Sequence, residues 1–429
     1  MKIACIGTGF VGVVTSAVFA KLGHTVVGLD IDESKVKSLR QGIVPFFEPG
    51  LSELLVETQK TGTLTFTTDY GTAIKDADIV MIMVGTPSAP DGQADLKYVF
   101  TAAESLAPHL KDGTIVIIKS TVPPGTNAKV ATLIRAKTNV NFEMASVPEF
   151  LKEGTAVEDT LHPDRAVIGV ESDYARDILT QLHTPLTDNI IVMKPESAQM
   201  CKYAANNYLA MRITFINQIA DLCEGNGADI EEVIRGIGAD QRIGSHYWYP
   251  GLGYGGSCFP KDVKEIASYA KAVGESDSIF IKIDALNESR IPKLMKHYDQ
   301  LVGGFAGKTV AILGLSFKKN TNDTRVSPAL KVIPYLLDHG ATVHAADPKA
   351  IGEIKPLLPT EVIYFDDPYT AATGSHVLIL LVEWDDYTQL DLAKISATMQ
   401  DPKYFFDTRN QYNKSAVVDA GLKYKGVGR

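Results

Sequence analysis

The first thirty residues contain a short apolar strand, a glycine-rich turn, a helix and a second apolar strand. Lys2–Ile6 has the pattern of a buried strand, Val11–Leu22 has that of a helix, and Thr25–Leu29 again predicts a strand. Strands that alternate with helices are joined by right-handed crossovers and form a parallel sheet. Such sheets bind ligands at the carboxyl ends of their strands, so we sought functional residues there.

The same pattern returns near residue 308, after a region that is mainly helical. Lys308–Leu313 and Thr342–Ala346 are predicted strands on either side of a helix at Ser327–His339, and an Asp follows the second strand in both copies. Glu196–Glu224 contains neither Gly nor Pro and predicts one long helix. We therefore predict an α/β fold of two Rossmann-like doubly wound domains joined by a long central helix and a helical region. The expected domains are 1–195, 196–303 and 304–429.

The composition excludes several classes of protein. The 429 residues carry a formal net charge of −9, and 45% are hydrophobic and 22% charged, as in ordinary globular proteins. An acidic balance argues against a nucleic-acid coat and against a protein that binds membrane surfaces. No apolar run reaches the roughly 20 residues that span a bilayer.

The four cysteines, Cys5, Cys201, Cys223 and Cys258, match neither a disulfide framework nor a zinc site, and we expect no metal. This usage predicts a reducing compartment, the cytoplasm. The first twenty residues share some features with a secretory signal. Their three glycines and the direct continuation into another strand argue against that interpretation.

A dinucleotide fingerprint occupies the first turn. The run Gly7-Thr8-Gly9-Phe10-Val11-Gly12 matches G-x-G-x-x-G between a predicted strand and a predicted helix. Gly7 permits the tight turn, Gly9 lets the backbone approach a pyrophosphate, and Gly12 lets helix and strand pack closely. The context makes glycines kept for packing alone the weaker interpretation.

The start of the helix and the end of the next strand complete the expected cofactor site. The helix N-terminus, at Phe10 and Val11, points its free N–H groups at the phosphates. Asp30 lies 18 residues after Gly12, where an acid accepts hydrogen bonds from a ribose diol. A carboxylate repels a 2′-phosphate and no Arg follows it, so NAD is favoured over NADP. Lys35 is expected to reach the pyrophosphate, with a solvated helix lysine as the alternative.

The most specific constellation is Gly253-Tyr254-Gly255-Gly256-Ser257-Cys258-Phe259-Pro260-Lys261-Asp262. Pro260 suits the first turn of a helix, which puts Cys258 at the N-terminus, where the dipole lowers a thiol pKa. The four glycines of Gly251–Gly256 are expected to clear side chains from the approach to the thiol. Asp262 lies about one turn later on the same face. The alternative is a buried, inert cysteine.

Further candidates lie on the long helix and at two strand ends. Lys202 and Asn206 are one turn apart, and a Lys there can donate a proton or stabilise an oxyanion, with Asn as a neutral orienting group. Thr121 and Glu149 lie in loops that follow predicted strands, and they are candidates for positioning water and for acting as a base. Ordinary surface residues are the alternative for all four.

Together these motifs resemble the UDP-glucose/GDP-mannose dehydrogenase family over nearly the whole chain and in the expected order. The matching segments are the fingerprint, Pro45–Leu51, Val84-Gly85-Thr86-Pro87, Ser120–Gly125, Pro148-Glu149-Phe150-Leu151, Lys202–Asn206, Gly255–Asp262 and Phe317–Arg325.

The resemblance implies a four-electron oxidation of UDP-glucose to UDP-glucuronate. The primary alcohol at C6 of the sugar loses a hydride to NAD, and Cys258 attacks the resulting aldehyde. The thiohemiacetal gives a second hydride to a second NAD, and water hydrolyses the thioester to a carboxylate. A thiol is needed because an aldehyde cannot readily donate hydride until a nucleophile makes it tetrahedral.

The resemblance also implies a role for each candidate. Lys202 assists proton transfer and stabilises the oxyanion, and Asn206 supports that site. Asp262 and Thr121 orient water, and Glu149 is the base for thioester hydrolysis.

The resemblance further implies binding residues and a partner. Thr86, Thr121, Glu153 and Arg325 would contact NAD besides the fingerprint. Arg242 would reach into the neighbouring subunit's site, which implies a homodimer held through the long helix. The three domains become an NAD-binding domain, a central dimerisation domain with the cysteine loop, and a UDP-sugar-binding domain. The implied sugar-nucleotide contacts are Glu149, Phe150, Leu151, Lys152, Lys202, Asn206, Tyr249, Gly253, Phe317, Lys318 and Arg409.

Three other functions compete with this one. The nearest is the same mechanism on GDP-mannose or an N-acetylated UDP-sugar. A two-electron hydroxyacid dehydrogenase shares the first domain and a catalytic Lys on the long helix, but it needs neither Cys258 nor a second nucleotide domain. A nucleotide-sensing protein without turnover does not require a thiol.

Overall fold

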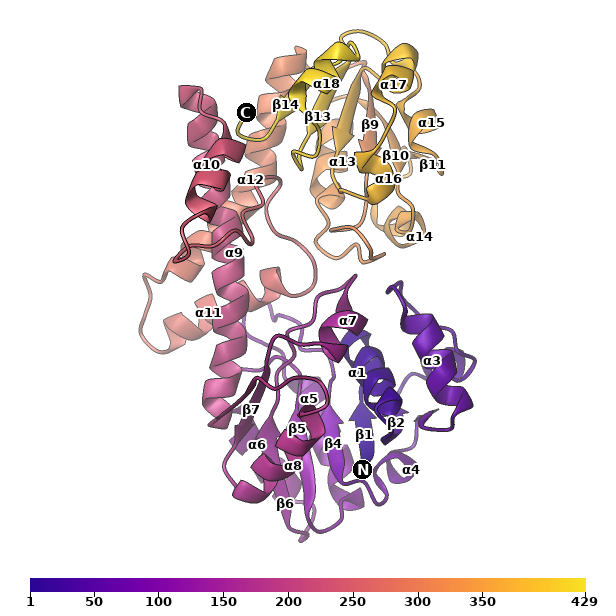
Figure 1. Ribbon diagram of the computed structural model, residues 1–429, viewed down its shortest axis with the longest axis vertical. Coiled ribbons are helices and arrows are strands. Elements are labelled where there is room, and N and C mark those ends of the chain that lie inside the picture. Colours follow the sequence, from indigo (N-terminus) through magenta and orange to yellow (C-terminus); the bar gives the residue numbers. More distant parts are fainter. The chain divides into compact units, whose positions relative to one another are not determined.

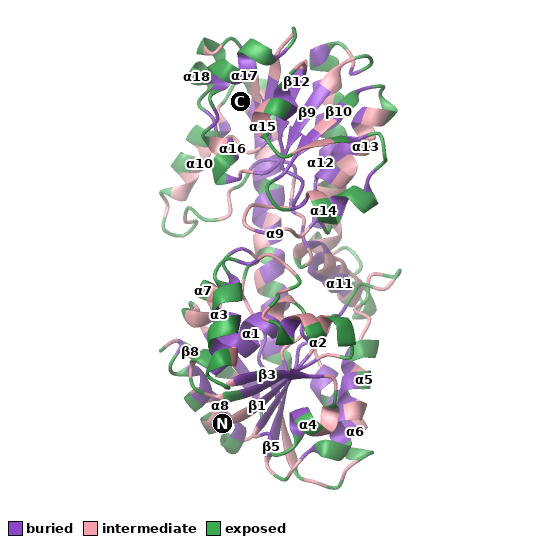
Figure 2. Cartoon of the chain, turned by 90° about the vertical axis from the view of Figure 1, so that its right-hand side faces the viewer, coloured by how far each residue is buried: buried purple, intermediate pink, exposed green.

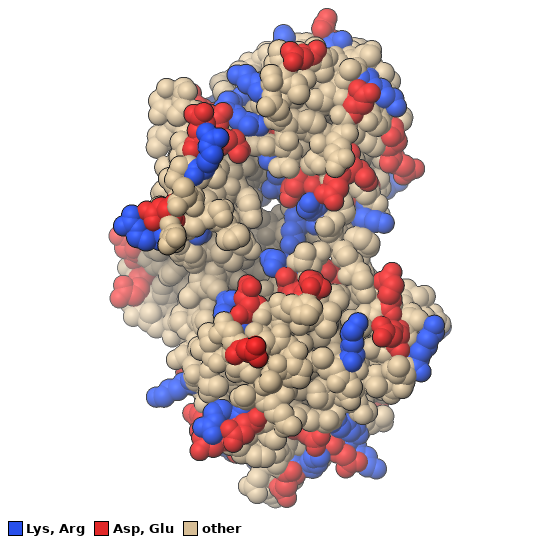
Figure 3. Space-filling view, in the orientation of Figure 1, with Lys and Arg blue, Asp and Glu red and all other residues tan.

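The computed structural model describes residues 1–429 and divides into two compact units, each with one sheet (Figure 1). The first unit is Met1–Ala205 with Ser268–Val273, and the second is Asn206–Ala267 with Gly274–Arg429. Figure 3 shows basic and acidic side chains interspersed over the face in view. No helix in the structure is long and apolar enough to cross a bilayer.

The sheet of the first unit has eight strands in the order β3-β2-β1-β4-β5-β6-β7-β8. All neighbours are parallel except β6 and β7. The order reverses between β1 and β4, which is the place where doubly wound sheets bind ligands. The strands are β1 (Lys2–Ile6), β2 (Thr25–Leu29), β3 (Leu64–Thr67), β4 (Ile79–Ile82), β5 (Thr114–Ile118), β6 (Phe142–Ser146), β7 (Ala166–Val170) and β8 (Ile190–Met193).

Helices cover this sheet, and most of its strands are buried, while the edge strand β8 is partly exposed (Figure 2). Side chains of one strand alternate between two cores: Ile3 and Cys5 pack on the side of the first helix, and Ala4 and Ile6 on the other. Burial on both sides explains why the strands read as continuous apolar runs. The helices are α1 (Phe10–Lys21), α2 (Glu33–Arg40), α3 (Leu51–Lys60), α4 (Tyr70–Ile74), α5 (Lys97–Leu106), α6 (Thr126–Arg135), α7 (Ala156–Leu161) and α8 (Asp173–His183).

The sheet of the second unit has six parallel strands in the order β11-β10-β9-β12-β13-β14. This order repeats that of β3-β2-β1-β4-β5-β6, so the two predicted Rossmann-like domains are confirmed. The strands are β9 (Thr309–Leu313), β10 (Thr342–Ala346), β11 (Ile363–Phe365), β12 (Val377–Leu380), β13 (Tyr404–Asp407) and β14 (Lys423–Gly426). Its helices are α13 (Ala329–Asp338), α14 (Ile351–Ile354), α15 (Pro368–Ala372), α16 (Asp385–Thr388), α17 (Leu392–Thr398) and α18 (Lys414–Asp419).

A single unbroken helix, α9 (Pro195–Asn226), forms the predicted long central helix (Figure 1). It begins at a proline, whose fixed φ suits the first helical position. The run Gly225-Asn226-Gly227 is expected to end it, and the helix includes the first two of these residues and ends before Gly227, whose φ is +81°. The other helices of this part are α10 (Ile230–Gly238), α11 (Phe259–Ala272) and α12 (Ile279–Val302).

Candidate active site

The glycines of the fingerprint differ in what a side chain would meet. Gly7 has φ of +96°, and a Cβ there would lie 2.7 Å from the Met83 carbonyl oxygen. A Cβ on Gly12 would lie 1.8 Å from the Gly7 carbonyl oxygen, so this glycine lets α1 approach β1. A Cβ on Gly9 would meet nothing within 4 Å. The turn is therefore open at Gly9, at the N-terminus of α1, where a pyrophosphate fits.

Asp30 directly follows β2, and its side chain forms hydrogen bonds with the fingerprint turn. Its Oδ2 accepts hydrogen bonds from Thr8 N at 2.9 Å and Thr8 Oγ1 at 2.8 Å, and Oδ1 accepts one from Asp32 N. Burial disfavours the carboxylate, but these hydrogen bonds hold the pKa of Asp30 below its usual value. The ionised group suits a ribose diol and repels a 2′-phosphate, as NAD requires.

Two residues lie close to Asp30 in the sequence and the structure. Lys35, the candidate for the pyrophosphate, has its Nζ 3.1 Å from Asp30 Oδ2. It lies in the first turn of α2, which Asp32 caps. Ile31 is 75% exposed beside the acid, and we had not singled it out.

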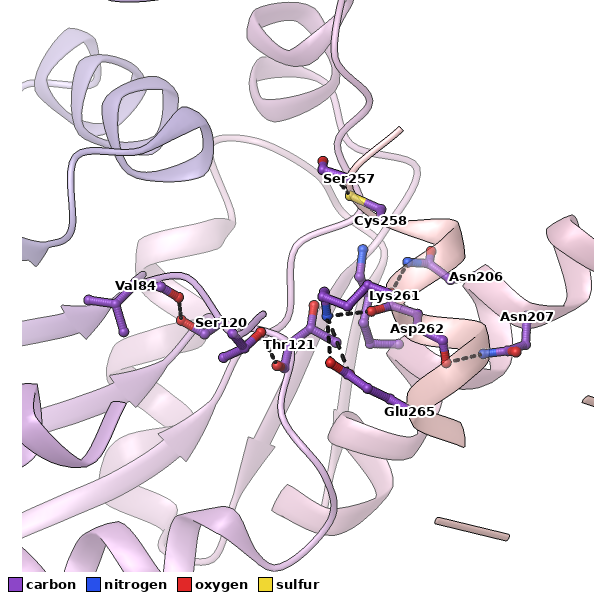
Figure 4. A network of polar contacts seen from close by, with 12 residues as sticks. Val84, Ser120, Thr121, Asn206, Asn207, Ser257, Cys258, Lys261, Asp262 and Glu265 are labelled. Carbon is purple, nitrogen blue, oxygen red and sulfur yellow. Dashed lines mark hydrogen bonds and ion pairs between the residues drawn. The ribbon is translucent and has the colours of Figure 1, made fainter. Parts of the chain in front are cut away.

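The loops after β4 and β5 are joined by side-chain hydrogen bonds. Thr86 Oγ1 donates to the Thr121 carbonyl at 2.9 Å, and Ser120 Oγ donates to the Val84 carbonyl at 2.7 Å (Figure 4). The structure thus brings together Thr86 and Thr121, two expected cofactor residues, at the carboxyl edge of the sheet.

A buried ion pair links the loop after β6 to α9. Glu149 Oε1 lies 3.0 Å from Lys202 Nζ, and the two side chains are 9% and 4% exposed. Glu149 Oε2 also accepts a hydrogen bond from Leu151 N at 2.8 Å. The Phe150 ring lies 5.3 Å from the same ammonium. The candidate base and the candidate proton carrier therefore contact each other directly.

The segment after Glu149 is pinned by Glu48, a residue whose role sequence reasoning missed. Glu48 is 5% exposed, and its oxygens accept hydrogen bonds from Gly154 N at 2.6 Å and Ala156 N at 2.7 Å. Glu153 lies in the segment that Glu48 holds. Lys152, an expected substrate residue, pairs with Asp159 at 2.8 Å.

Cys258 is the exposed cysteine of the four. It stands at the N-terminus of α11, because the Asp262 N–H donates to the Cys258 carbonyl at 2.9 Å. Ser257 Oγ lies 3.6 Å from the sulfur. A helix N-terminus stabilises a thiolate, the reactive form. By contrast, burial raises the pKa of the Cys5 thiol to about 12.

Asp262 anchors a buried polar network beneath the thiol (Figure 4). Its Oδ2 accepts a hydrogen bond from Asn206 Nδ2 at 2.5 Å, and its Oδ1 lies 2.6 Å from Lys261 Nζ. Asn207 Nδ2 donates to the Asp262 carbonyl. Two expected catalytic residues, Asn206 and Asp262, are therefore in direct contact.

Lys261 is a second residue that we had not chosen as a candidate. It contacts Asp262 and, at 3.3 Å, Glu265. Burial opposes its charge, but the two carboxylates and Cys258 raise the pKa of Lys261 above its usual value. In the sequence, only its position within the cysteine motif pointed to Lys261. Its burial depends on tertiary contacts, which the sequence does not show.

The glycine-rich loop Gly251–Gly256 packs closely rather than leaving open space as we expected. A Cβ on Gly253 would lie 2.3 Å from Asn287 Oδ1, and one on Gly256 would lie 2.6 Å from the Phe317 ring. Asn287 also exchanges two hydrogen bonds with the Tyr254 backbone. These glycines hold the loop against α12 and the second sheet's first loop.

The expected sugar-nucleotide residues of the second unit lie in several loops. Arg409 lies 3.1 Å from Glu383, and its Nη2 donates to the Phe317 carbonyl at 3.4 Å. The Lys318 ammonium lies 5.4 Å from the Phe317 ring centre. Phe317, Lys318 and Arg409 are therefore neighbours.

Three other expected residues lie elsewhere on this unit. Arg325, expected near NAD, pairs with Asp323 at 2.7 Å. Arg242 pairs with Asp240 at 2.6 Å, and its side chain is 88% exposed. Tyr249 is 56% exposed.

The acid after β10 differs sharply from Asp30. Asp347 is 3% exposed, and its carboxylate accepts hydrogen bonds from Leu315 N, Lys349 N and Trp384 Nε1 at 2.7, 2.8 and 3.1 Å. These donors leave it no room for a ribose. The second Rossmann-like fold therefore lacks the acid that selects a dinucleotide.

The expected catalytic residues fall into two sets. Lys202 and Asn206 lie one turn apart on α9. The first unit holds Thr121, Glu149 and Lys202, and the second holds Asn206, Cys258 and Asp262.

Comparison with known proteins covers the whole chain. Three models of the UDP-glucose/GDP-mannose dehydrogenase family match: the NAD binding domain at residues 1–187, the central domain at 196–289 and the UDP binding domain at 311–414. The chain is 42% identical over 438 residues to a UDP-glucose 6-dehydrogenase of Rhizobium meliloti, with all of both chains covered. It is 41% identical over 430 residues to UDP-glucose 6-dehydrogenase TuaD of Bacillus subtilis, covering 100% of this chain and 93% of the relative.

A solved structure gives the same result. A UDP-glucose dehydrogenase from the archaeon Pyrobaculum islandicum superposes with a TM-score of 0.92 at 37% identity, covering 99% of this chain and 97% of that one. Fold, fingerprint and cysteine motif agree with these matches, and the chain belongs to the UDP-glucose/GDP-mannose dehydrogenase family.

Proposed function

We propose that the protein is a UDP-glucose 6-dehydrogenase, which oxidises UDP-glucose to UDP-glucuronate with NAD. One observation carries the chemistry: an exposed thiol stands at the N-terminus of α11 above the buried Asn206–Asp262–Lys261 network. Alcohol oxidation alone does not need a nucleophile on the protein, whereas oxidation of an aldehyde needs one to make the carbon tetrahedral, and a thiol is suited to that role. Identities of 41% and 42% over the full chain to UDP-glucose 6-dehydrogenases support UDP-glucose as the substrate.

NAD would bind at the turn of the first unit. The open backbone at Gly9 and the N-terminus of α1 suit the pyrophosphate, and Asp30 suits the ribose. We assign Thr86, Thr121, Glu153 and Arg325 to further contacts. NAD, when bound, accepts the hydride in each oxidation.

The Glu149–Lys202 pair would manage the protons of the first oxidation. Lys202 passes one of its ammonium protons to the Glu149 carboxylate and takes up the proton of the C6 alcohol, so that it stays charged and stabilises negative charge on the oxygen. Glu149 holds the ammonium at 3.0 Å and so orients it. Asn206, held by Asp262 at 2.5 Å, offers a fixed amide to the same oxygen.

Cys258 would carry the second stage. Its sulfur adds to the aldehyde carbon, forming a thiohemiacetal whose oxidation leaves a thioester. Glu149 removes a proton from water, which attacks the thioester and releases the carboxylate and the thiol. Thr121 and Asp262 orient that water.

The second Rossmann-like domain would hold the uridine diphosphate. Phe317, Lys318 and Arg409 are neighbours there, and a cationic side chain suits a diphosphate. We assign Phe150, Leu151, Lys152, Tyr249 and Gly253 to the rest of the sugar nucleotide. The three domains are then an NAD domain, a central domain and a UDP-sugar domain, at 1–195, 196–303 and 304–429.

A homodimer held through α9 fits an apolar stripe on this helix. Tyr208, Phe215 and Leu222 recur every seven residues and are 52%, 50% and 64% exposed. Exposed apolar side chains in a row along a helix are typical of a helix-to-helix interface. In that dimer the exposed Arg242 would reach the partner subunit's site. Four free cysteines with a reactive one among them suit a reducing compartment, so we place the enzyme in the cytoplasm.

A panel of nucleotide sugars tests this function. Purified protein with NAD is incubated with UDP-glucose, GDP-mannose or UDP-N-acetylmannosamine, and NADH formation is followed. We expect UDP-glucose to give the highest kcat/KM. A higher value for another sugar would reassign the substrate, and no NADH with any of them would contradict the proposal.

The variant Cys258→Ser refines the panel. We expect it to bind UDP-glucose with wild-type affinity, measured by calorimetry, but to form no UDP-glucuronate. Cys201→Ser, on α9, is the matched control and should keep wild-type turnover. Full acid formation by Cys258→Ser would exclude the covalent route.

A further inference from the structure

Lys119 is a charged residue that the proposed reaction does not yet use. It directly follows β5, and its side chain is partly buried within the first unit. Together with Glu149 it lines a cavity of about 210 Å³. Its Nζ makes no hydrogen bond and no ion pair anywhere in the structure, although an unpaired ammonium is costly to bury.

The surroundings of Lys119 are unusual for a lysine. Burial lowers its pKa from 10.5 to about 8. Glu149 and Cys5 act in the opposite direction and favour the ammonium, and Lys202 opposes it. His183, from α8, also faces it; burial and the charge of Lys119 lower the pKa of His183 to about 4, so this imidazole is neutral near pH 7.

The other charged side chains that line the cavity are paired, stacked on a ring or exposed. Lys152 is paired with Asp159, and Arg165 stacks on the Phe150 ring at 4.0 Å. His162 and Asp164 are exposed at its rim. Among these cavity-lining charges, Lys119 is therefore the ammonium near Glu149 that forms no ion pair with a carboxylate.

The Glu149–Lys202 pair carries no net charge, since one carboxylate faces one ammonium at 3.0 Å. A neutral pair gives little help to negative charge that develops on a neighbouring oxygen. A third, positive group beside the pair makes the cluster positive overall and favours such a charge. Lys119 supplies that group from the wall of the cavity that Glu149 also lines.

We propose that Lys119 is a positioning residue, which acts through the Glu149–Lys202 pair to favour negative charge on the substrate oxygen that Lys202 serves. This inference rests on the proposed function. Lys119 donates no hydrogen bond to the reacting atoms and acts by its charge alone. Its influence therefore lasts only while it is protonated.

Lys119→Met tests the role in turnover, with Lys129→Met as control, because Lys129 is an exposed lysine on α6. At pH 7 we expect kcat of Lys119→Met to fall about tenfold, less than for a group that contacts an oxyanion, with little change in KM. The ratio of wild-type to Lys119→Met kcat should shrink towards one as the pH rises through about 8. Lys129→Met should follow the wild-type profile. Lys119→Gln carries the same test if Lys119→Met does not fold.

The free energy of unfolding tests the ionisation without any substrate. The folded pKa of about 8 lies below the ordinary 10.5, so the unfolded chain binds more protons between these values. Wild-type stability should therefore rise relative to Lys119→Met as the pH increases from 8 to 10. Parallel stability curves would show that Lys119 is not perturbed and would overturn the inference.

The two arms separate this inference from the proposed function. If wild-type protein oxidises UDP-glucose and Lys119→Met and Lys119→Gln keep its kcat at every pH, the role of Lys119 is overturned while the function stands. If wild-type protein oxidises no nucleotide sugar, the function is overturned and the role falls with it, whatever the stability curves show.

Discussion

Single residues decide whether the cofactor turn can form. Gly9 and Gly12 belong to the same fingerprint, but only Gly12 lies against backbone: its Cβ would be 1.8 Å from the Gly7 carbonyl oxygen, whereas that of Gly9 would meet nothing within 4 Å. Gly12 is thus needed for the packing of α1 on β1, whereas Gly9 leaves the backbone open to a ligand.

The pair Gly12→Ala and Gly9→Ala separates these two roles. Gly12→Ala should destabilise the protein by several kcal/mol, about the range of overpacked cores, because α1 must move off β1. Gly9→Ala should leave thermal unfolding near that of the wild type and weaken NAD binding, because the methyl group occupies the approach to the backbone. Scanning calorimetry and NAD titration measure both. Equal melting temperatures for the two variants would contradict the packing argument.

At the scale of elements, the sequence predicts the buried strands well. The predicted Lys2–Ile6, Thr25–Leu29 and Thr342–Ala346 match β1, β2 and β10 at both ends, because apolar runs between turn residues mark strands buried on both sides. It does not reveal β8, where Ile191 and Val192 are 39% and 43% exposed. An exposed edge strand lacks that apolar signal.

The site was predictable where motif and spacing carry the signal. Cys258, Asp262 and Asn206 become candidates this way, and the structure puts the last two in contact. Glu48 and Lys119 were not found, since both are charged residues whose role comes from burial among partners far apart in the sequence. Sequence periodicity reports which face of an element is apolar, not which charge is buried.

The stripe on α9 yields a prediction for this element. Phe215→Glu places a charge in the middle of Tyr208, Phe215 and Leu222, which the proposed dimer buries. We expect light scattering after size-exclusion chromatography to show dimers for the wild type and monomers for Phe215→Glu. Val418→Glu, at a 51% exposed apolar position on α18, is the control and should remain dimeric. A dimeric Phe215→Glu would exclude this interface.

On the scale of the whole molecule, the chain holds the same strand order twice but only one dinucleotide-type acid. Asp30 keeps a lone pair open on Oδ1 beyond its bond from Asp32, whereas Asp347 is enclosed by backbone and Trp384 donors. The same fold thus serves two binding functions: the first unit binds the cofactor, and the second, as we propose, binds the sugar nucleotide.

The stoichiometry of the complete reaction tests the central claim most directly. Purified protein is given limiting UDP-glucose and excess NAD, and NADH is measured by absorbance while UDP-glucuronate is measured by chromatography. A thiol that captures the aldehyde for a second oxidation predicts two NADH for each UDP-glucuronate formed and no free aldehyde. One NADH per sugar, with an aldehyde as the product, would contradict the account.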